Sequence, residues 1–76
     1  MAPKLPSVTG ANLVRALKRA GWYEIRQQGS HIMLGHTDNP KLIVVPVHKG
    51  HDVKKGLLAD ILKDVGLSSD DLRRLL

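Results

Sequence analysis

Residues 26–34, RQQGSHIML, decide the fold because they join a turn signal to the start of an apolar strand. Gly29 and Ser30 are residues typical of a turn between two strands. The chain on either side of this pair, residues 22–28 and 31–36, has the composition and length of strands. The stretch therefore predicts an antiparallel hairpin.

The second strand of this hairpin presents different side chains on its two faces. Because successive side chains of a strand point to opposite faces, Ile32 and Leu34 share one face, and His31 and Met33 share the other. If Ile32 and Leu34 pack against helices, His31 faces outward, where a ligand can reach it.

The chain before the hairpin has the pattern of an amphipathic helix. Thr9 can cap a helix that runs to Ala20, and Gly21 follows in the position that glycine favours after a helix end. The apolar side chains that fall on one face of this helix are Leu13, Ala16, Leu17 and Ala20. Residues 1–8 contain two prolines and are expected to form a flexible lead-in, so the single domain is predicted to span residues 9–76.

A third strand is predicted after the hairpin, over residues 42–47. The cluster TDNPK, residues 37–41, is typical of a turn. The following residues are apolar and rich in β-branched side chains, as in a strand. Pro46 cannot donate a hydrogen bond to a neighbouring strand, so it indicates a sheet edge or the end of the strand.

Two helices are predicted in the last third of the chain. An apolar stripe indicates a helix over residues 57–65, which Gly66 ends. Ser68 followed by Asp71 is typical of the cap of a short helix over residues 70–76. The order α-β-β-β-α, with a short helix added, predicts an α+β fold with a three-stranded antiparallel sheet and the helices on one face.

Composition limits the kind of protein and its partners. The 76 residues, 42% hydrophobic and 25% charged, predict one small globular domain. The chain has no cysteine, which excludes disulfides and thiolate metal sites. No apolar run approaches a membrane span and no signal peptide is evident, so we expect a cytoplasmic protein. The net charge of +5 favours an anionic partner, with nucleic acid ahead of an acidic protein or a membrane.

His31 is the strongest candidate for chemistry. An imidazole changes its protonation near neutral pH and can act as a base or an acid. RNA supplies its own nucleophile, the 2′-hydroxyl, so a ribonuclease of this kind requires a proton acceptor and cations near the phosphate. We therefore expect no metal and no cofactor. The alternative is an ordinary solvent-facing strand histidine, and the spacing of residues alone favours that alternative.

The loop before the second predicted helix carries further candidates. Lys54 and Lys55 precede the helix, where lysines oppose the helix dipole but would join its free N–H groups in binding a phosphate. Lys49 extends this basic stretch, and His48, two residues after Pro46, is a candidate phosphate or base contact. A merely solvated lysine pair explains the same residues equally well.

The same region raises the alternative of a metal site, because imidazoles and carboxylates are metal ligands. The residues concerned are His36, His48, His51 and Asp52. Their spacing matches no dedicated metal motif, so we expect no metal there. Trp22, one of two aromatic residues, is expected to fill the junction of helix and sheet and not to stack on a base.

Four short motifs lie in a fixed order along residues 12–68: LKRAGW, RQQGSH, PVH and KGLLADIL. In this order and at these intervals they resemble the HicA family of mRNA interferase toxins. The resemblance implies a fold like that of a double-stranded-RNA-binding domain, and an endoribonuclease that cuts mRNA and so inhibits translation. The N-terminal stretch and the tail from Ser69 lie outside it.

The resemblance also implies roles for particular residues. The histidine after Gly-Ser, here His31, is implied to be catalytic, and a HicB-like antitoxin is implied to cover the active face. Many members carry a second histidine where this chain has Ile32. A second proton donor must then come from elsewhere, and His48 is our candidate.

The hypothesis is therefore a toxin that acts as a metal-independent endoribonuclease on mRNA. The residues expected to contact RNA are Arg26, Gly29, Ser30, His48, Lys49, Lys54 and Lys55. Gly29 would give the RNA backbone room to approach. The alternatives are a non-catalytic RNA-binding module of the same fold and a small regulatory protein with a protein partner.

Overall fold

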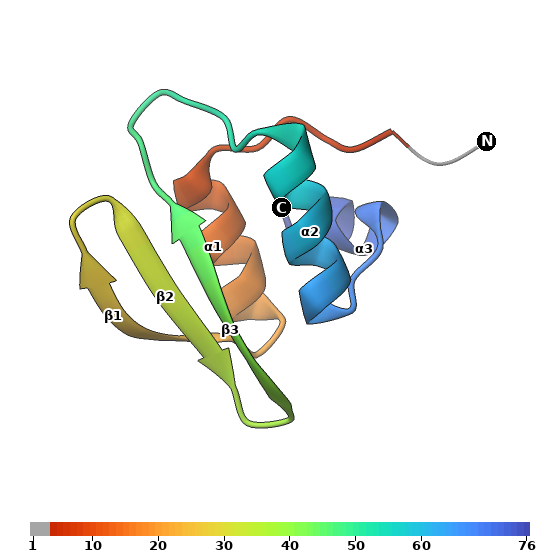
Figure 1. The fold of residues 1–76 in the computed structure, drawn as a ribbon. Helices are drawn as coiled ribbons and strands as arrows, with labels where there is room; N and C mark the ends of the chain where they lie inside the picture. Colours follow the sequence, from red (N-terminus) through yellow and green to blue (C-terminus); the bar gives the residue numbers. More distant parts are fainter. Residues whose placement is uncertain (1–3) are drawn as a thin grey trace.

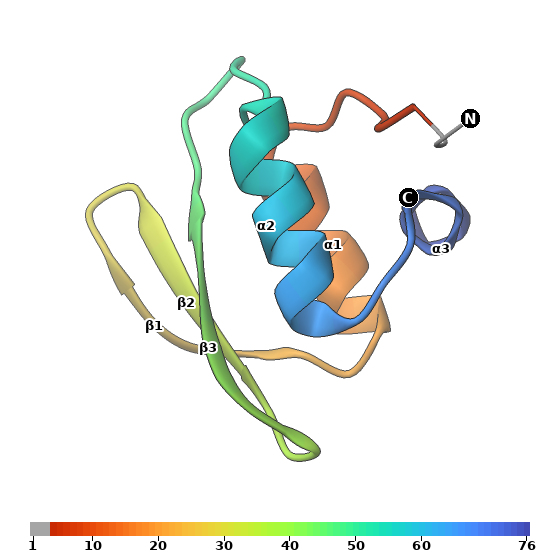
Figure 2. The same cartoon turned by 45° about the vertical axis from the view of Figure 1, so that its right-hand side comes forward.

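The computed structural model describes residues 4–76, which form one sheet and three helices (Figure 1). The elements are α1 (Gly10–Arg19), β1 (Tyr23–Gln28), β2 (His31–His36), β3 (Asn39–Pro46), α2 (Lys55–Val65) and α3 (Ser69–Leu75). The strands form one antiparallel sheet in the order β1-β2-β3. Helices α1 and α2 lie side by side on one face of this sheet, and the other face is open (Figure 2). The predicted α+β architecture is confirmed.

The core lies between the sheet and the two longer helices. Leu13 and Leu17 of α1 are fully buried, as is Leu34 of β2. The alternation predicted for β2 is confirmed, because Ile32 also packs against this core while His31 is exposed. Trp22 is 4% exposed and fills the junction between α1 and the sheet, as predicted.

The first strand does not follow simple alternation. A register shift between Glu24 and Arg26 leaves Ile25 as an extra residue in the β1–β2 pairing. Tyr23 then pairs with Gly35, and Arg26 pairs with Met33. With strict alternation from Tyr23, the side chain of Arg26 would lie on the helix-covered face of the sheet. Because of the bulge, Arg26 instead lies on the open face, which it shares with Met33 and His31.

The predicted boundaries of the third strand and second helix are wrong by a few residues. Strand β3 begins at Asn39 instead of residue 42, because His36 pairs with Asn39 across a turn of only Thr37 and Asp38. Pro40 is tolerated because β3 is an edge strand. Helix α2 begins at Lys55 instead of residue 57.

The helix ends carry the predicted caps. The Thr9 hydroxyl accepts a hydrogen bond from the Asn12 N–H at 3.2 Å. The Ser68 hydroxyl accepts from the Asp71 N–H, and the Asp71 carboxylate accepts from the Ser68 N–H. Within residues 4–76, no helix is long and apolar enough to cross a membrane.

The N-terminal segment follows the surface of the domain from Lys4 onward. Val8 is buried in the core, and its carbonyl accepts a hydrogen bond from the Val53 N–H at 2.8 Å. Leu5 packs against the same core. These contacts differ from the loose lead-in expected over residues 1–8, of which residues 1–3 lie outside the described part of the chain.

Candidate nucleic-acid interface

The turn before β2, the end of β3 and the loop before α2 meet at one corner of the molecule (Figure 1). His31 lies opposite Pro46 in the β2–β3 ladder, and the Val47 N–H donates to the Ser30 carbonyl at 2.6 Å. Gly29 has a φ of 58°, a left-handed conformation that glycine adopts without strain. We call residues 29–31 and 46–54 the His31 corner.

The start of α1 holds this corner in place. Gly10 is buried against the end of β3, and a β-carbon at this position would overlap the carbonyl oxygen of Pro46. Thr9 forms an isolated bridge with Asp52 in the loop. The loop is therefore fixed at both ends by backbone contacts with the N-terminal part of the domain.

His31 projects from the open face of the sheet and is exposed, as the alternation predicted. It lines a hollow of about 250 Å³. The residues around this strand hollow are Arg26, Gln28, His31, Met33 and Val44. Met33 and Val44 are cross-strand partners and form an apolar floor, while Arg26 and Gln28 come from β1. An imidazole, a guanidinium and an apolar surface thus adjoin one another.

A larger hollow of about 430 Å³ lies on the other side of Pro46, between the loop and the first turn of α2. The residues that line this loop hollow are Pro46, His48, His51, Asp52, Val53, Lys54 and Leu57. Lys54 is the N-cap residue of α2 and makes no side-chain capping hydrogen bond within residues 4–76. The first N–H groups of α2 therefore lack a side-chain acceptor at its N-cap.

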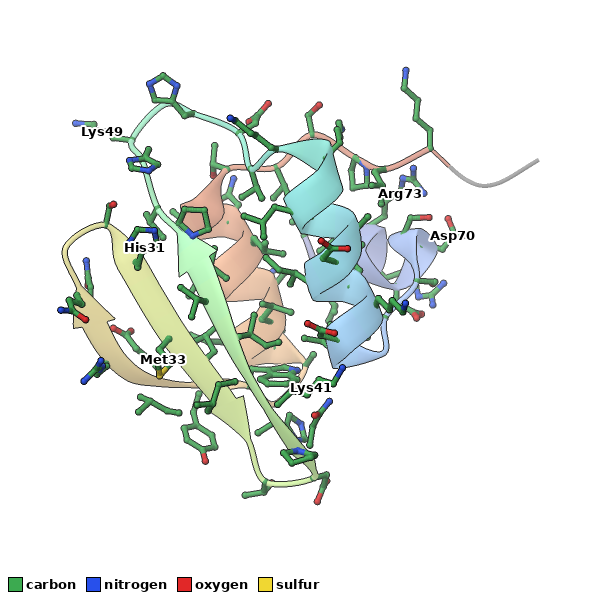
Figure 3. The ribbon with its side chains drawn as sticks, viewed as in Figure 1. His31, Met33, Lys41, Lys49, Asp70 and Arg73 are labelled. Carbon is green, nitrogen blue, oxygen red and sulfur yellow. The ribbon has the colours of Figure 1, made fainter. Side chains whose placement is uncertain are left out.

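The structure brings most of the predicted RNA-contacting residues to this corner or to the strand hollow beside it. Arg26 lines the strand hollow, His48 and Lys54 line the loop hollow, and Gly29 and Ser30 form the turn beside His31. Figure 3 places His31 and Lys49 at the same corner. The predicted residues thus form one surface, with the exception described next.

Lys55 lines neither hollow. Its ammonium group donates hydrogen bonds to the Leu5 carbonyl at 2.9 Å and to the Ser7 hydroxyl at 3.2 Å. These contacts tie the start of α2 to the N-terminal segment. Lys55 therefore has a structural partner where the sequence suggested a phosphate ligand.

His36 is separated from the other histidines, because it lies at the opposite end of the sheet from Pro46. Its Nδ1 accepts the Asp38 N–H at 3.0 Å, so its Nε2 is the donor to the Ala20 carbonyl at 3.3 Å. Its ring also contacts Trp22, with 5.1 Å between the ring centroids. In the part of the chain that the structure describes, no three histidine or acidic side chains are grouped to hold a metal ion.

Several residues of the two hollows were not predicted from the sequence. They are Gln28, Met33 and Val44 in the strand hollow, and Pro46, Val53 and Leu57 in the loop hollow; His51 and Asp52 were considered only as metal ligands. Met33 and Val44 could have been found from the register of the hairpin, since both lie on the His31 face. The loop hollow depends on how the loop folds back onto α2, for which the sequence carries no periodic signal.

Comparison with known proteins identifies the class of this chain. A family model described as HicA toxin of bacterial toxin–antitoxin matches residues 10–67, from the start of α1 to just beyond the end of α2. The match and the α+β fold define a small toxin of a toxin–antitoxin system. The chain belongs to the HicA toxin family, which confirms the resemblance seen in the sequence. No curated protein matches the chain. Membership of this family implies an antitoxin partner.

Proposed function

We propose that this toxin is a metal-independent endoribonuclease that cleaves mRNA and thereby inhibits translation, with His31 as its acid–base residue. The observation that carries the proposal is the exposed His31 ring in the strand hollow, beside Arg26 and next to the basic loop. The imidazole supplies the proton acceptor for the 2′-hydroxyl, and the neighbouring cations can bind the phosphate.

The proposed reaction begins with proton transfer from the 2′-hydroxyl to an imidazole nitrogen of His31. The 2′-oxygen then attacks the adjacent phosphorus, and the bond from phosphorus to the 5′-oxygen breaks. The departing 5′-oxygen receives a proton from a second donor, for which His48 in the adjoining hollow is the candidate. The products would carry a 2′,3′-cyclic phosphate and a 5′-hydroxyl.

Residues of the His31 corner and of the strand hollow bind and orient the RNA in this proposal. Arg26, Lys49 and Lys54 would contact phosphates and stabilise the negative charge that develops during cleavage. Met33 and Val44 offer an apolar surface to a sugar or base. We further propose that the chain acts in the cytoplasm and that its antitoxin is HicB-like and covers the His31 corner.

Induced expression in bacteria tests the toxic function. We expect the wild-type chain to arrest growth and to shorten mRNAs, and His31→Ala, present at the same level, to do neither. His36→Asn is the control histidine variant, because His36 lies at the other end of the sheet. Growth arrest by His31→Ala equal to that of the wild type would contradict the proposal.

One observation favours an alternative, a non-catalytic RNA-binding module. Among the described residues, His31 is the one histidine that lines the strand hollow, so this hollow itself holds no second imidazole that could donate a proton to the departing 5′-oxygen. A module of this kind would bind RNA with a strong salt dependence and would not cut it. Direct assay of cleavage by the purified chain separates the two functions.

A further inference from the structure

We infer that the loop hollow binds one nucleotide of the RNA, next to the nucleotide that is cut at His31. This inference deepens the proposed function and rests on it for the identity of the ligand as RNA. It assigns a second subsite to residues between β3 and α2, separate from the strand hollow.

The size and walls of the loop hollow suit a partly apolar group such as a nucleotide base. Its volume of about 430 Å³ exceeds the 250 Å³ of the strand hollow. Pro46, Val53 and Leu57 supply apolar wall, and Leu57 is 39% exposed although it is a large apolar residue of a helix that packs on the core. A bound base would cover this leucine and remove its apolar surface from water.

The polar groups of the hollow match a single nucleotide. Lys54 stands at the N-terminus of α2, where its charge favours one phosphate. The imidazoles of His48 and His51 can stack on a base or form hydrogen bonds with it. The carboxylate of Asp52 only accepts hydrogen bonds when ionised, which suits base N–H groups and opposes a second phosphate.

The position of the hollow connects it to the proposed cleavage site. Pro46 lines the loop hollow and is also the cross-strand partner of His31, which lines the strand hollow. Neighbouring strands lie about 4.8 Å apart, so the two hollows adjoin at the end of β3. An RNA strand that crosses this end of the sheet would place successive nucleotides in the two hollows.

Titration of the full chain with nucleoside 5′-monophosphates, followed by NMR of backbone amides, tests the inference. We expect shifts at His51, Val53 and Leu57. Leu57→Trp would fill the hollow and should weaken this binding at least tenfold. Leu42→Trp is the matched control, because Leu42 is 59% exposed on β3 and lines neither hollow; its binding should equal that of the wild type.

Two results would overturn the inference. One is a set of shifts confined to the strand hollow, and the other is an equal affinity and equal shifts with inorganic phosphate, which would reduce the hollow to an anion site. Binding requires no cleavage, so the two proposals fail separately. A chain that binds the nucleotide here but never cuts RNA would support the second subsite and contradict the ribonuclease.

Discussion

At the scale of single residues, Gly10 controls how closely α1 approaches the His31 corner. A β-carbon at Gly10 would overlap the Pro46 carbonyl oxygen, and backbone at this position cannot move aside as a flexible side chain could. We therefore predict that Gly10→Ala lowers the free energy of unfolding by about 1–3 kcal/mol, the usual cost of overpacking. Denaturant unfolding of the two chains measures this difference.

Gly56 provides the matched control for this prediction. It lies in the first turn of α2, and a β-carbon there would meet no atom of the described residues within 4 Å. Gly56→Ala should leave stability unchanged or raise it by up to about 1 kcal/mol, because alanine favours the helix. Equal destabilisation by both substitutions would show that packing against Pro46 is not the cause.

Lys54 and Lys55 are adjacent in sequence and are predicted to behave differently toward RNA. Lys54 lines the loop hollow, whereas Lys55 donates to Leu5 and Ser7. Lys54→Met should weaken RNA binding and reduce the slope of log affinity against log salt by about 0.7, the value for one contact to a single strand. Lys55→Met should leave that slope unchanged.

Affinity measured across a series of salt concentrations tests this prediction, with Lys63→Met as a control for the loss of one positive charge. Lys63 is an exposed residue of the last turn of α2, far along the helix from the corner. An equal change of slope for Lys54→Met and Lys55→Met would contradict the assignment. It would mean that Lys55 leaves its partners to bind phosphate.

At the scale of elements, α3 depends on the charge of one carboxylate. The N–H and the hydroxyl of Ser68 hydrogen-bond to Asp71, and with the nearby Arg74 guanidinium they hold the pKa of Asp71 below its usual range. Because the pKa of Asp71 is lower in the folded chain than in the unfolded chain, the ionised cap stabilises the fold at pH values above the unfolded pKa of about 4. This stability is lost as the pH falls through the lowered pKa of the folded chain.

Asp71→Asn tests this pH dependence. The difference in unfolding free energy between the wild type and Asp71→Asn should be constant from pH 7 to about pH 5 and should shrink as pH falls below about 4. Asp60→Asn is a suitable control, because Asp60 is an exposed residue in the middle of α2. A difference that grows on acidification would contradict the role of the Asp71 carboxylate.

The elements themselves were largely predictable because their signals are local. Hydrophobic periodicity predicted the helices, and the capping residues Thr9 and Ser68 predicted where α1 and α3 begin. Signals that depend on partner strands were missed: the bulge at Ile25 and the pairing of His36 with Asn39 arise from register, which no single strand encodes. Likewise, Lys55 is held by backbone about fifty residues away in sequence.

At the scale of the whole molecule, the candidate site is assembled from segments far apart in the chain. The start of α1, the β1–β2 turn, the end of β3 and the loop before α2 converge on one corner (Figure 1). Strand alternation predicted that His31 faces outward, and the motifs predicted the family. The two hollows are formed by tertiary packing. The sequence therefore predicted His31 as a site residue but did not predict which residues surround it.

The central claim is tested most directly by incubating the purified chain and His31→Ala with a long mRNA in excess EDTA, after circular dichroism shows equal folding. We predict that the wild type cleaves the RNA and leaves 2′,3′-cyclic phosphate ends, while His31→Ala binds the RNA and leaves it intact. If neither protein cuts but both bind RNA, the ribonuclease proposal is contradicted and the chain is a binding module.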